Sequence, residues 1–296
     1  MSDTRYRGRF APTPSGLLHA GSLATALGSW LDARAADGVW LIRMEDLDTP
    51  RNQIGADTQI LQQLAQFGLQ SDEPVIWQSH RLEHYQRALD NLIELELAYP
   101  CTCSRKSILE HLSSSGHLRE RHQELIYPGF CRNKPSNTNS DLNQAHAWRA
   151  KVPDCSIHGQ HLPSAVGDFI LKRADGIFSY QLSVVLDDAA QGITHIVRGQ
   201  DLLDNTPRQI WLAKALGFKI PQYLHLPLVC NEHQEKLSKQ TQAAPVLPRS
   251  ELEAVRLLKE AALHLGLPEL PATNSVSQYL SFAVNAWPKA KANLKR

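Results

Sequence analysis

The sequence lacks an excess of charge of either sign, and this limits the partners that its overall electrostatic field could attract. Lysine and arginine together number 31, aspartate and glutamate number 30, and the formal net charge is +1. No global field therefore draws the chain to nucleic acid, and any contact with RNA requires a local basic patch. Internal repeats and long low-complexity segments are missing as well.

Long apolar runs are also absent from the sequence. Met1–Arg5 contains no apolar stretch, so it does not predict a secretory signal. No uninterrupted apolar run is long enough to cross a bilayer, so we expect a cytoplasmic location and no membrane partner.

The cysteine count, five, is odd. In a chain without an export signal this favours free thiols or a metal site over a disulfide framework.

The order of predicted elements indicates an α/β fold. The chain has 296 residues, 42% hydrophobic and 21% charged, which suits one large α/β domain with attachments. A short strand near residues 7–10, a helix over 21–36 and an apolar strand over 39–44 follow one another. This order predicts a parallel strand–helix–strand unit.

Further elements are expected along the rest of the chain. Helices are predicted at 56–67, 81–97, 206–216, 250–266 and 276–286, and strands at 193–199 and 224–229. Residues 176–186 read as a strand that passes into a helix. The region 98–164 is rich in cysteine, histidine and serine, and we interpret it as an insertion. Residues 231–242 are polar and without a hydrophobic period, which indicates a surface loop.

The turn between the first strand and the first helix predicts an anion-binding site. It runs from Arg7 to Ser22, and the helix begins near Gly21. Unpaired backbone N–H groups at a helix start favour an anion, and Arg9 and His19 add donors. The simpler interpretation is a well-capped first turn without a ligand.

Three acids, Glu45, Asp46 and Asp48, follow the second strand, at the end of a parallel sheet where ligands bind.

Cysteines in the insertion predict a metal site. Cys101 and Cys103 are separated by one residue, and Cys131 is the natural third ligand. Thiolates with a nitrogen or oxygen ligand suit tetrahedral Zn²⁺. From the residues alone the fourth ligand is open among His111, His117, His122 and Tyr127. The alternative is a set of reduced, partly buried thiols. Cys155 and Cys230 lie far from the cluster and are interpreted as structural.

Four motifs in order carry a resemblance to a known family. They are Pro-Thr-Pro-Ser-Gly-Leu-Leu-His at 12–19, Arg-Met-Glu-Asp-Leu-Asp at 43–48, Val-Arg-Gly-Gln-Asp at 197–201 and Lys-Leu-Ser-Lys at 236–239. The chain resembles the glutamyl branch of the class I aminoacyl-tRNA synthetases over residues 6–241. His-Ala-Gly-Ser at 19–22 is similar to the HIGH signature, with Ser22 in place of its last histidine. Residues 236–240 are similar to the KMSKS loop, with Gln240 in place of its final serine.

The resemblance implies a domain plan. A Rossmann-like parallel sheet would comprise 1–97 and 165–245, with an inserted zinc-binding subdomain at 98–164. Only a short helical segment, 246–296, follows where full glutamyl enzymes continue into an anticodon-binding domain. This shortened form resembles the branch that attaches glutamate to the queuosine base in the anticodon of tRNA(Asp). The RNA-binding surface is not evident from the sequence, and the insertion and the basic C-terminal helices are candidates.

The resemblance also implies residue roles. The glutamate site would comprise Arg9, Phe10, Ala11, Pro12, Thr13, Glu45, Tyr180 and Arg198. ATP would contact His19, Gly21, Ser22 and Lys239, with His19, Lys236 and Lys239 as catalytic groups. Mg²⁺ is expected with ATP, and a structural Zn²⁺ is expected on Cys101, Cys103, Tyr127 and Cys131. Without the motifs, Glu45 and Arg198 could simply pair with each other or with neighbours, and the two lysines could be solvated.

The expected activity is an ATP-dependent ligase reaction. L-glutamate would be activated as glutamyl-adenylate and transferred to queuosine-containing tRNA(Asp). One alternative is a compact glutamyl-tRNA synthetase that charges a tRNA 3′ end. A second alternative is a synthetase-like RNA-binding protein without catalysis.

Overall fold

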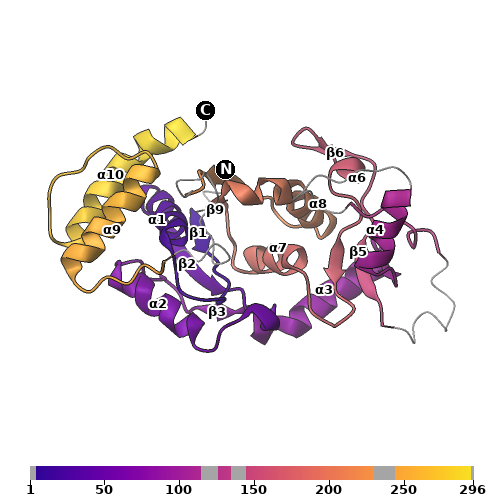
Figure 1. Cartoon of the computed structure of the whole chain (residues 1–296). Helices are drawn as coiled ribbons and strands as arrows, with labels where there is room; N and C mark the ends of the chain where they lie inside the picture. The colour runs from indigo at the N-terminus through magenta and orange to yellow at the C-terminus, as the bar shows by residue number, and fades with distance from the viewer. Residues whose placement is uncertain (1–4, 115–125, 135–144, 230–243, 295–296) are drawn as a thin grey trace. The chain divides into compact units, whose positions relative to one another are not determined.

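The chain folds into two compact units. A computed structural model describes residues 5–114, 126–134, 145–229 and 244–294 (Figure 1). The first unit comprises Met1–His80, Gln191–Leu203 and Pro221–Arg296, and the second comprises Arg81–Ala190 and Asp204–Ile220. Each unit is therefore assembled from segments that are distant in sequence.

Parallel β-sheet structure forms the centre of the first unit. A three-stranded sheet contains β1 (Arg7–Phe10), β2 (Val39–Met44) and β3 (Ile76–Trp77), and a two-stranded sheet contains β9 (His195–Gly199) and β10 (Gln222–Leu226). β1 pairs with β2, β2 with β3, and β10 with β9, all in parallel. The N–H of Thr194, the residue before β9, donates to the Arg7 carbonyl over 2.9 Å, so the start of β9 lies beside β1. The predicted parallel arrangement is confirmed.

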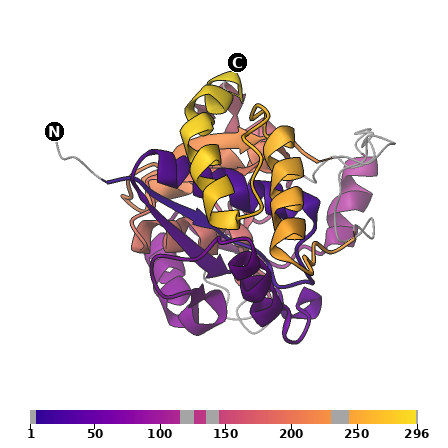
Figure 2. The same cartoon turned by 90° about the vertical axis from the view of Figure 1, so that its left-hand side faces the viewer.

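Helices around this sheet bury its core. They are α1 (Ala20–Ala35), the short η1 (Thr49–Arg51), α2 (Ala56–Gln66), α9 (Glu251–His264) and α10 (Val276–Leu294). β2 is buried along its whole length, as expected of a central parallel strand. α1 packs against β1, α9 and α10, and the C-terminal helices lie side by side (Figures 1 and 2). α10 continues past the predicted end at residue 286 and contains Pro288.

A buried carboxylate connects α10 to the start of the chain. Asp32 on α1 accepts hydrogen bonds from the Tyr6 hydroxyl at 2.7 Å and the Trp287 indole N–H at 2.8 Å. The Lys291 ammonium lies 2.5 Å from the same carboxylate. Burial raises the pKa of Tyr6, and the neighbouring Asp32 charge raises it further. α10 is therefore part of the core of the first unit.

The second unit combines helices with a small antiparallel sheet. Its elements are η2 (Gln78–Arg81, shared with the first unit), α3 (Leu82–Glu94), β4 (Ala98–Cys101), α4 (Arg105–Ser114), β5 (Ala147–Ala150), β6 (Ser156–Ile157), β7 (Gln160–His161), α6 (Leu162–Ala165), β8 (Ile170–Lys172), α7 (Tyr180–Ala190), η3 (Gln200–Asn205, which spans both units) and α8 (Thr206–Ala215). The strand order is β4-β5-β8. In the predicted strand–helix segment 176–186, Phe178 forms only an isolated bridge with Lys172. The apolar run after it forms the helix α7, which is buried on nearly every side.

The compact units group the chain differently from the predicted domain plan. The plan assigned residues 81–97 and 165–190 to the catalytic domain and 246–296 to a separate segment. By contacts, α3 and α7 belong with the insertion strands, whereas α9 and α10 share a core with α1. Packing between distant segments decides this grouping, and the predicted functional boundaries stay a prediction.

Candidate active site and cysteine cluster

The strand-to-helix turn places His19 at the start of α1. His19 is the N-cap residue, and its Nδ1 accepts from the Ser22 N–H at 3.4 Å. The Ser22 hydroxyl lies 3.1 Å from its Nε2. The imidazole therefore lies at the end of α1 where first-turn N–H groups attract anions. Gly21 follows within the same turn, so the predicted ATP residues of this stretch are adjacent.

The backbone of the turn is held at two points by the chain that follows β2. The Glu45 N–H donates to the Pro12 carbonyl at 3.0 Å, and the Gln53 N–H donates to the Pro14 carbonyl at 2.9 Å. Gly16 has φ 132°, a conformation that other residues rarely adopt. The path from β1 to His19 is thereby defined by backbone hydrogen bonds.

Three predicted glutamate-binding side chains lie on neighbouring strands of the first unit. Arg9 is in β1, Glu45 directly follows β2, and Arg198 is near the end of β9. They are 4%, 9% and 3% exposed. Each of the three lies toward the carboxyl-terminal end of its strand or directly beyond it. Buried charges of both signs suit a ligand with carboxylate and ammonium groups.

Arg43 forms an ion pair with Glu45, although it was not among the residues predicted for the glutamate site. Its Nη2 donates to Glu45 Oε1 at 3.3 Å, and its Nη1 donates to Gln191 Oε1 at 2.8 Å. Arg43 is fully buried. A single arginine inside the apolar strand 39–44 was the available signal, because a buried guanidinium requires a buried partner.

Arg198 is held by groups on β10 and in η3, the short helix that follows β9. Its Nε donates to His225 Nε2 at 3.4 Å, and its Nη2 donates to the Leu202 carbonyl at 3.1 Å. Its guanidinium lies 5.1 Å from the centre of the Tyr223 ring. His225 is the register partner of Arg198 on β10. Since arginine only donates, His225 Nε2 must accept, which places the imidazole proton on Nδ1.

The other predicted site residues lie in β1 and the turn after it, at the start of α7, or outside the described residues. Phe10 is buried in β1, and Ala11 to Thr13 form the partly buried start of the turn. Tyr180 is the first residue of α7, in the second unit, so its contact with glutamate stays a prediction. Lys236, Lys239 and Gln240 lie outside the described residues. The described chain resumes after them at Ala244, and Pro245 forms a bridge with His19.

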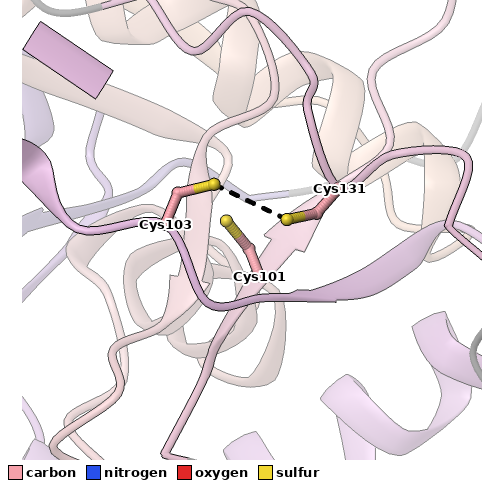
Figure 3. Close-up of side chains that lie close together, drawn as sticks. All are labelled: Cys101, Cys103 and Cys131. Carbon is pink, nitrogen blue, oxygen red and sulfur yellow. Dashed lines mark hydrogen bonds between the residues drawn. The ribbon is translucent and has the colours of Figure 1, made fainter. Parts of the chain in front are cut away.

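The cysteine cluster is brought together in the second unit. Cys101 ends β4, Cys103 precedes α4, and Cys131 comes from the segment 126–134 (Figure 3). Their Sγ atoms lie within 4.8 Å of one another, and those of Cys103 and Cys131 are 3.6 Å apart. Such a group could hold a metal ion.

Tyr127 completes the cluster. Its hydroxyl lies 3.4 Å from the Sγ atoms of Cys101 and Cys103 and accepts the Cys131 N–H at 2.9 Å. The Arg149 guanidinium lies 3.9 Å from the centre of its ring. Burial raises the pKa of Cys103 to about 11 and also raises the pKa of Tyr127. His111 instead contacts the Phe130 ring, and His117, His122 and Cys230 lie outside the described residues.

Comparison with known proteins gives the family. Residues 5–254 match the family model described as tRNA synthetases class I (E and Q), catalytic domain. The chain belongs to this synthetase family. The fold expected from the four motifs, a class I synthetase with a parallel sheet, is therefore confirmed.

Relatives of this synthetase are similar over nearly their whole length. The Glutamyl-Q tRNA(Asp) synthetase of Albidiferax ferrireducens is 49% identical over 314 residues, covering 96% of this chain and 98% of the relative. The protein of that name from Leptothrix cholodnii is 50% identical and covers 95% and 96%.

A solved structure agrees with the fold. The glutamate-tRNA synthetase of Elizabethkingia anophelis superposes with a TM-score of 0.76 at 23% identity. The match covers 96% of the present chain and 66% of the longer Elizabethkingia chain. Among the described residues of the present protein, no helix combines the length and the apolar character needed to span a bilayer.

Proposed function

We propose that this synthetase activates L-glutamate with ATP and transfers the glutamyl group to the queuosine base in the anticodon of tRNA(Asp). The observation that carries the proposal is the near-complete match to relatives bearing that name, at about half identity. The strand-end charges supply chemistry suited to the amino acid. The reaction joins the glutamate α-carboxylate to the ATP α-phosphate with loss of pyrophosphate, and the adenylate then transfers its glutamyl group to the RNA with release of AMP.

Buried charges support the glutamate half of the proposal. Glutamate has two carboxylates and one ammonium group, so its site needs cations and an acid. Arg198 and Arg9 are buried arginines whose guanidinium groups suit carboxylates. Glu45 can accept from the α-ammonium, and Arg43 keeps it oriented. Phe10 to Thr13 would line the site, and Tyr180 would supply a hydroxyl.

The ATP half of the proposal depends on the turn at His19. His19, Gly21 and Ser22 stand where first-turn N–H groups favour phosphate. Lys239, with Lys236 as a second candidate, would neutralise charge as pyrophosphate leaves. Mg²⁺ would accompany ATP, since this ion usually bridges phosphates and binds few protein groups.

We further propose that the cysteine cluster is a structural zinc site in an inserted subdomain. A tetrahedral Zn²⁺ with bonds of about 2.3 Å to sulfur separates two thiolates by about 3.8 Å. The 3.6 Å between Cys103 and Cys131 fits this edge. A phenolate ligand would lie about 3.5 Å from each sulfur, and Tyr127 is 3.4 Å from two of them. When bound, zinc would favour the deprotonated ligands and cross-link β4 to the segment 126–134.

The decisive experiment for the reaction has two steps. Purified protein should exchange pyrophosphate into ATP with glutamate and without tRNA, and Lys239→Ala should abolish this exchange. The protein should then load glutamate onto tRNA(Asp) that contains queuosine. Equal loading of queuosine-free tRNA(Asp) would contradict the assignment.

A compact glutamyl-tRNA synthetase is the second candidate, because the fold is similar to a glutamate-tRNA synthetase. Removal of the 3′-terminal adenosine from the tRNA before the reaction separates the two. Transfer to a base in the anticodon survives this removal, whereas charging of the 3′ end is lost.

The zinc site is tested by metal analysis. We expect one zinc per chain, loss of zinc in Cys103→Ser, and weaker zinc retention against a chelator in Tyr127→Phe. His111→Gln is the matched control and should retain zinc as the unaltered protein does. Loss of zinc in His111→Gln with retention in Tyr127→Phe would reverse the ligand assignment.

A further inference from the structure

Gln63 on α2 contacts two segments that are distant from it in sequence. Its Oε1 accepts the Leu18 N–H at 2.8 Å. Its Nε2 donates to the Leu18 carbonyl at 3.3 Å and to the Val246 carbonyl at 2.7 Å. The side chain is buried, with the residue only 2% exposed. One amide therefore connects α2 to the turn before α1 and to the chain before α9.

These partners determine which way the amide points. A backbone N–H requires an acceptor and the two carbonyls require donors, so the oxygen must face Leu18 N–H and the nitrogen must face the carbonyls. Both N–H bonds of Nε2 and one lone-pair direction of Oε1 are used. An aliphatic side chain of similar size would leave the Leu18 N–H and the Val246 carbonyl buried without this partner, which is costly.

Leu18 and Val246 also contact each other directly. The Val246 N–H donates to the Leu18 carbonyl at 2.8 Å. The next pair outward, His19 and Pro245, forms a β-bridge. Leu18 and Val246 are both buried. The residue before Pro245 is Ala244, where the described chain resumes after 230–243.

We propose that Gln63 is a positioning residue for adenylate formation, because it fixes His19 relative to the chain at Pro245 and Val246. This inference rests on the proposed role of His19 at the ATP phosphates. His19 is the N-cap of α1, so a shift of Leu18 displaces both the imidazole and the first-turn N–H groups. Gln63 touches no reacting atom and acts only through the backbone of Leu18 and Val246.

The predicted effect concerns rate more than glutamate affinity. Displacement of a catalytic group by about 1 Å can lower a rate about 100-fold. Glu45 and Arg198 are held by contacts that do not involve Gln63, so glutamate binding should change little. For Gln63→Leu we expect glutamate-dependent pyrophosphate exchange to fall in kcat by about ten- to 100-fold. The KM for glutamate should stay within about twofold of the unaltered value.

Two variants on the same helix serve as controls. Gln59→Leu makes the same chemical change at an exposed position of α2. Ile60→Ala removes a fully buried side chain and lowers stability without altering these hydrogen bonds. All rates are measured on the full chain at a temperature where each variant is folded, and they are normalised to the folded fraction. Both controls should keep the kcat of the unaltered protein.

Gln63→Glu keeps the inference testable if Gln63→Leu fails to fold. The protonated acid can accept from Leu18 N–H and donate to the Val246 carbonyl, whereas the carboxylate would face two carbonyl oxygens. Its kcat should therefore rise relative to the unaltered protein as the pH falls. An unchanged kcat in the Gln63 variants, or an equal loss in Ile60→Ala, would overturn the inference. Absence of exchange in the unaltered protein would instead refute the proposed function, so the two failures are distinguishable.

Discussion

Replacement of Asp32 by asparagine should weaken the packing of α10 against α1 within the first unit. Asp32→Asn keeps the shape of the side chain and removes its negative charge. In the folded protein this carboxylate accepts from Tyr6 and Trp287 and lies 2.5 Å from the ammonium of Lys291. The asparagine oxygen can still accept from the indole and the ammonium, and its NH₂ group can donate to the Tyr6 hydroxyl after that hydroxyl rotates. The hydrogen bonds thus survive, but their charge assistance is lost.

The magnitude follows from these three contacts. Hydrogen bonds to a charged group contribute about 1 kcal/mol more than neutral ones. Three contacts therefore predict a loss of about 3 kcal/mol in the free energy of unfolding. This lies at the lower end of the roughly 3–5 kcal/mol typical when one partner of a buried ion pair is removed. A loss at the lower end is expected because the Lys291 side chain is 26% exposed, so its ammonium group remains partly hydrated when the carboxylate is removed.

Urea unfolding followed by circular dichroism, together with hydrogen exchange of the α10 amides, measures this loss. Both probes are needed because the two compact units need not unfold together. Lys291→Met should destabilise α10 similarly, and the double variant should lose less than the sum of the single losses. Lys289→Met, at an exposed position of the same helix, is the control and should change stability by less than about 0.5 kcal/mol. A loss below about 0.5 kcal/mol in Asp32→Asn, or equal behaviour of the two lysine variants, would refute the reasoning.

Three further predictions concern the sheet edge and pH. Arg43→Met removes the cation beside Glu45 and should raise the KM for glutamate about tenfold or more, measured by pyrophosphate exchange; an unchanged KM would contradict its positioning role. His225→Gln retains an acceptor for Arg198 and should keep a KM near that of the unaltered protein, whereas His225→Phe should raise it; equal KM values would show that the acceptor is unimportant. Burial would raise the pKa of Asp72, but hydrogen bonds from a guanidinium and a backbone N–H hold it below its ordinary value of 3.8. Its stabilising contribution is therefore complete above pH 3.8 and lost as the pH falls through the lower folded-state value, so Asp72→Asn should flatten the acid limb of stability in urea titrations.

Local patterns in the sequence were sufficient for several elements. The strand 39–44 was predicted at its observed bounds, because an apolar run of that length between turns is typical of a buried strand. The helix after the His19 turn was also predicted, with its start within one residue. The three cysteines and Tyr127 were chosen from spacing and resemblance, and the structure brings all four side chains together. In these cases the signal lies within a short segment or a known motif.

Tertiary structure alone decided which buried polar groups meet. Gln63 is one glutamine in an amphipathic helix, and nothing near it in sequence identifies Leu18 or Val246 as its partners. The pairing of Arg198 with His225 depends on the register of two strands, and the contact of Asp32 with Lys291 joins opposite ends of the chain. The sequence alone determined the family motifs, the central strands and the residue types that carry charge. The structure decided their partners, because a buried donor or charge must be satisfied by whatever group the packing of distant segments brings within reach.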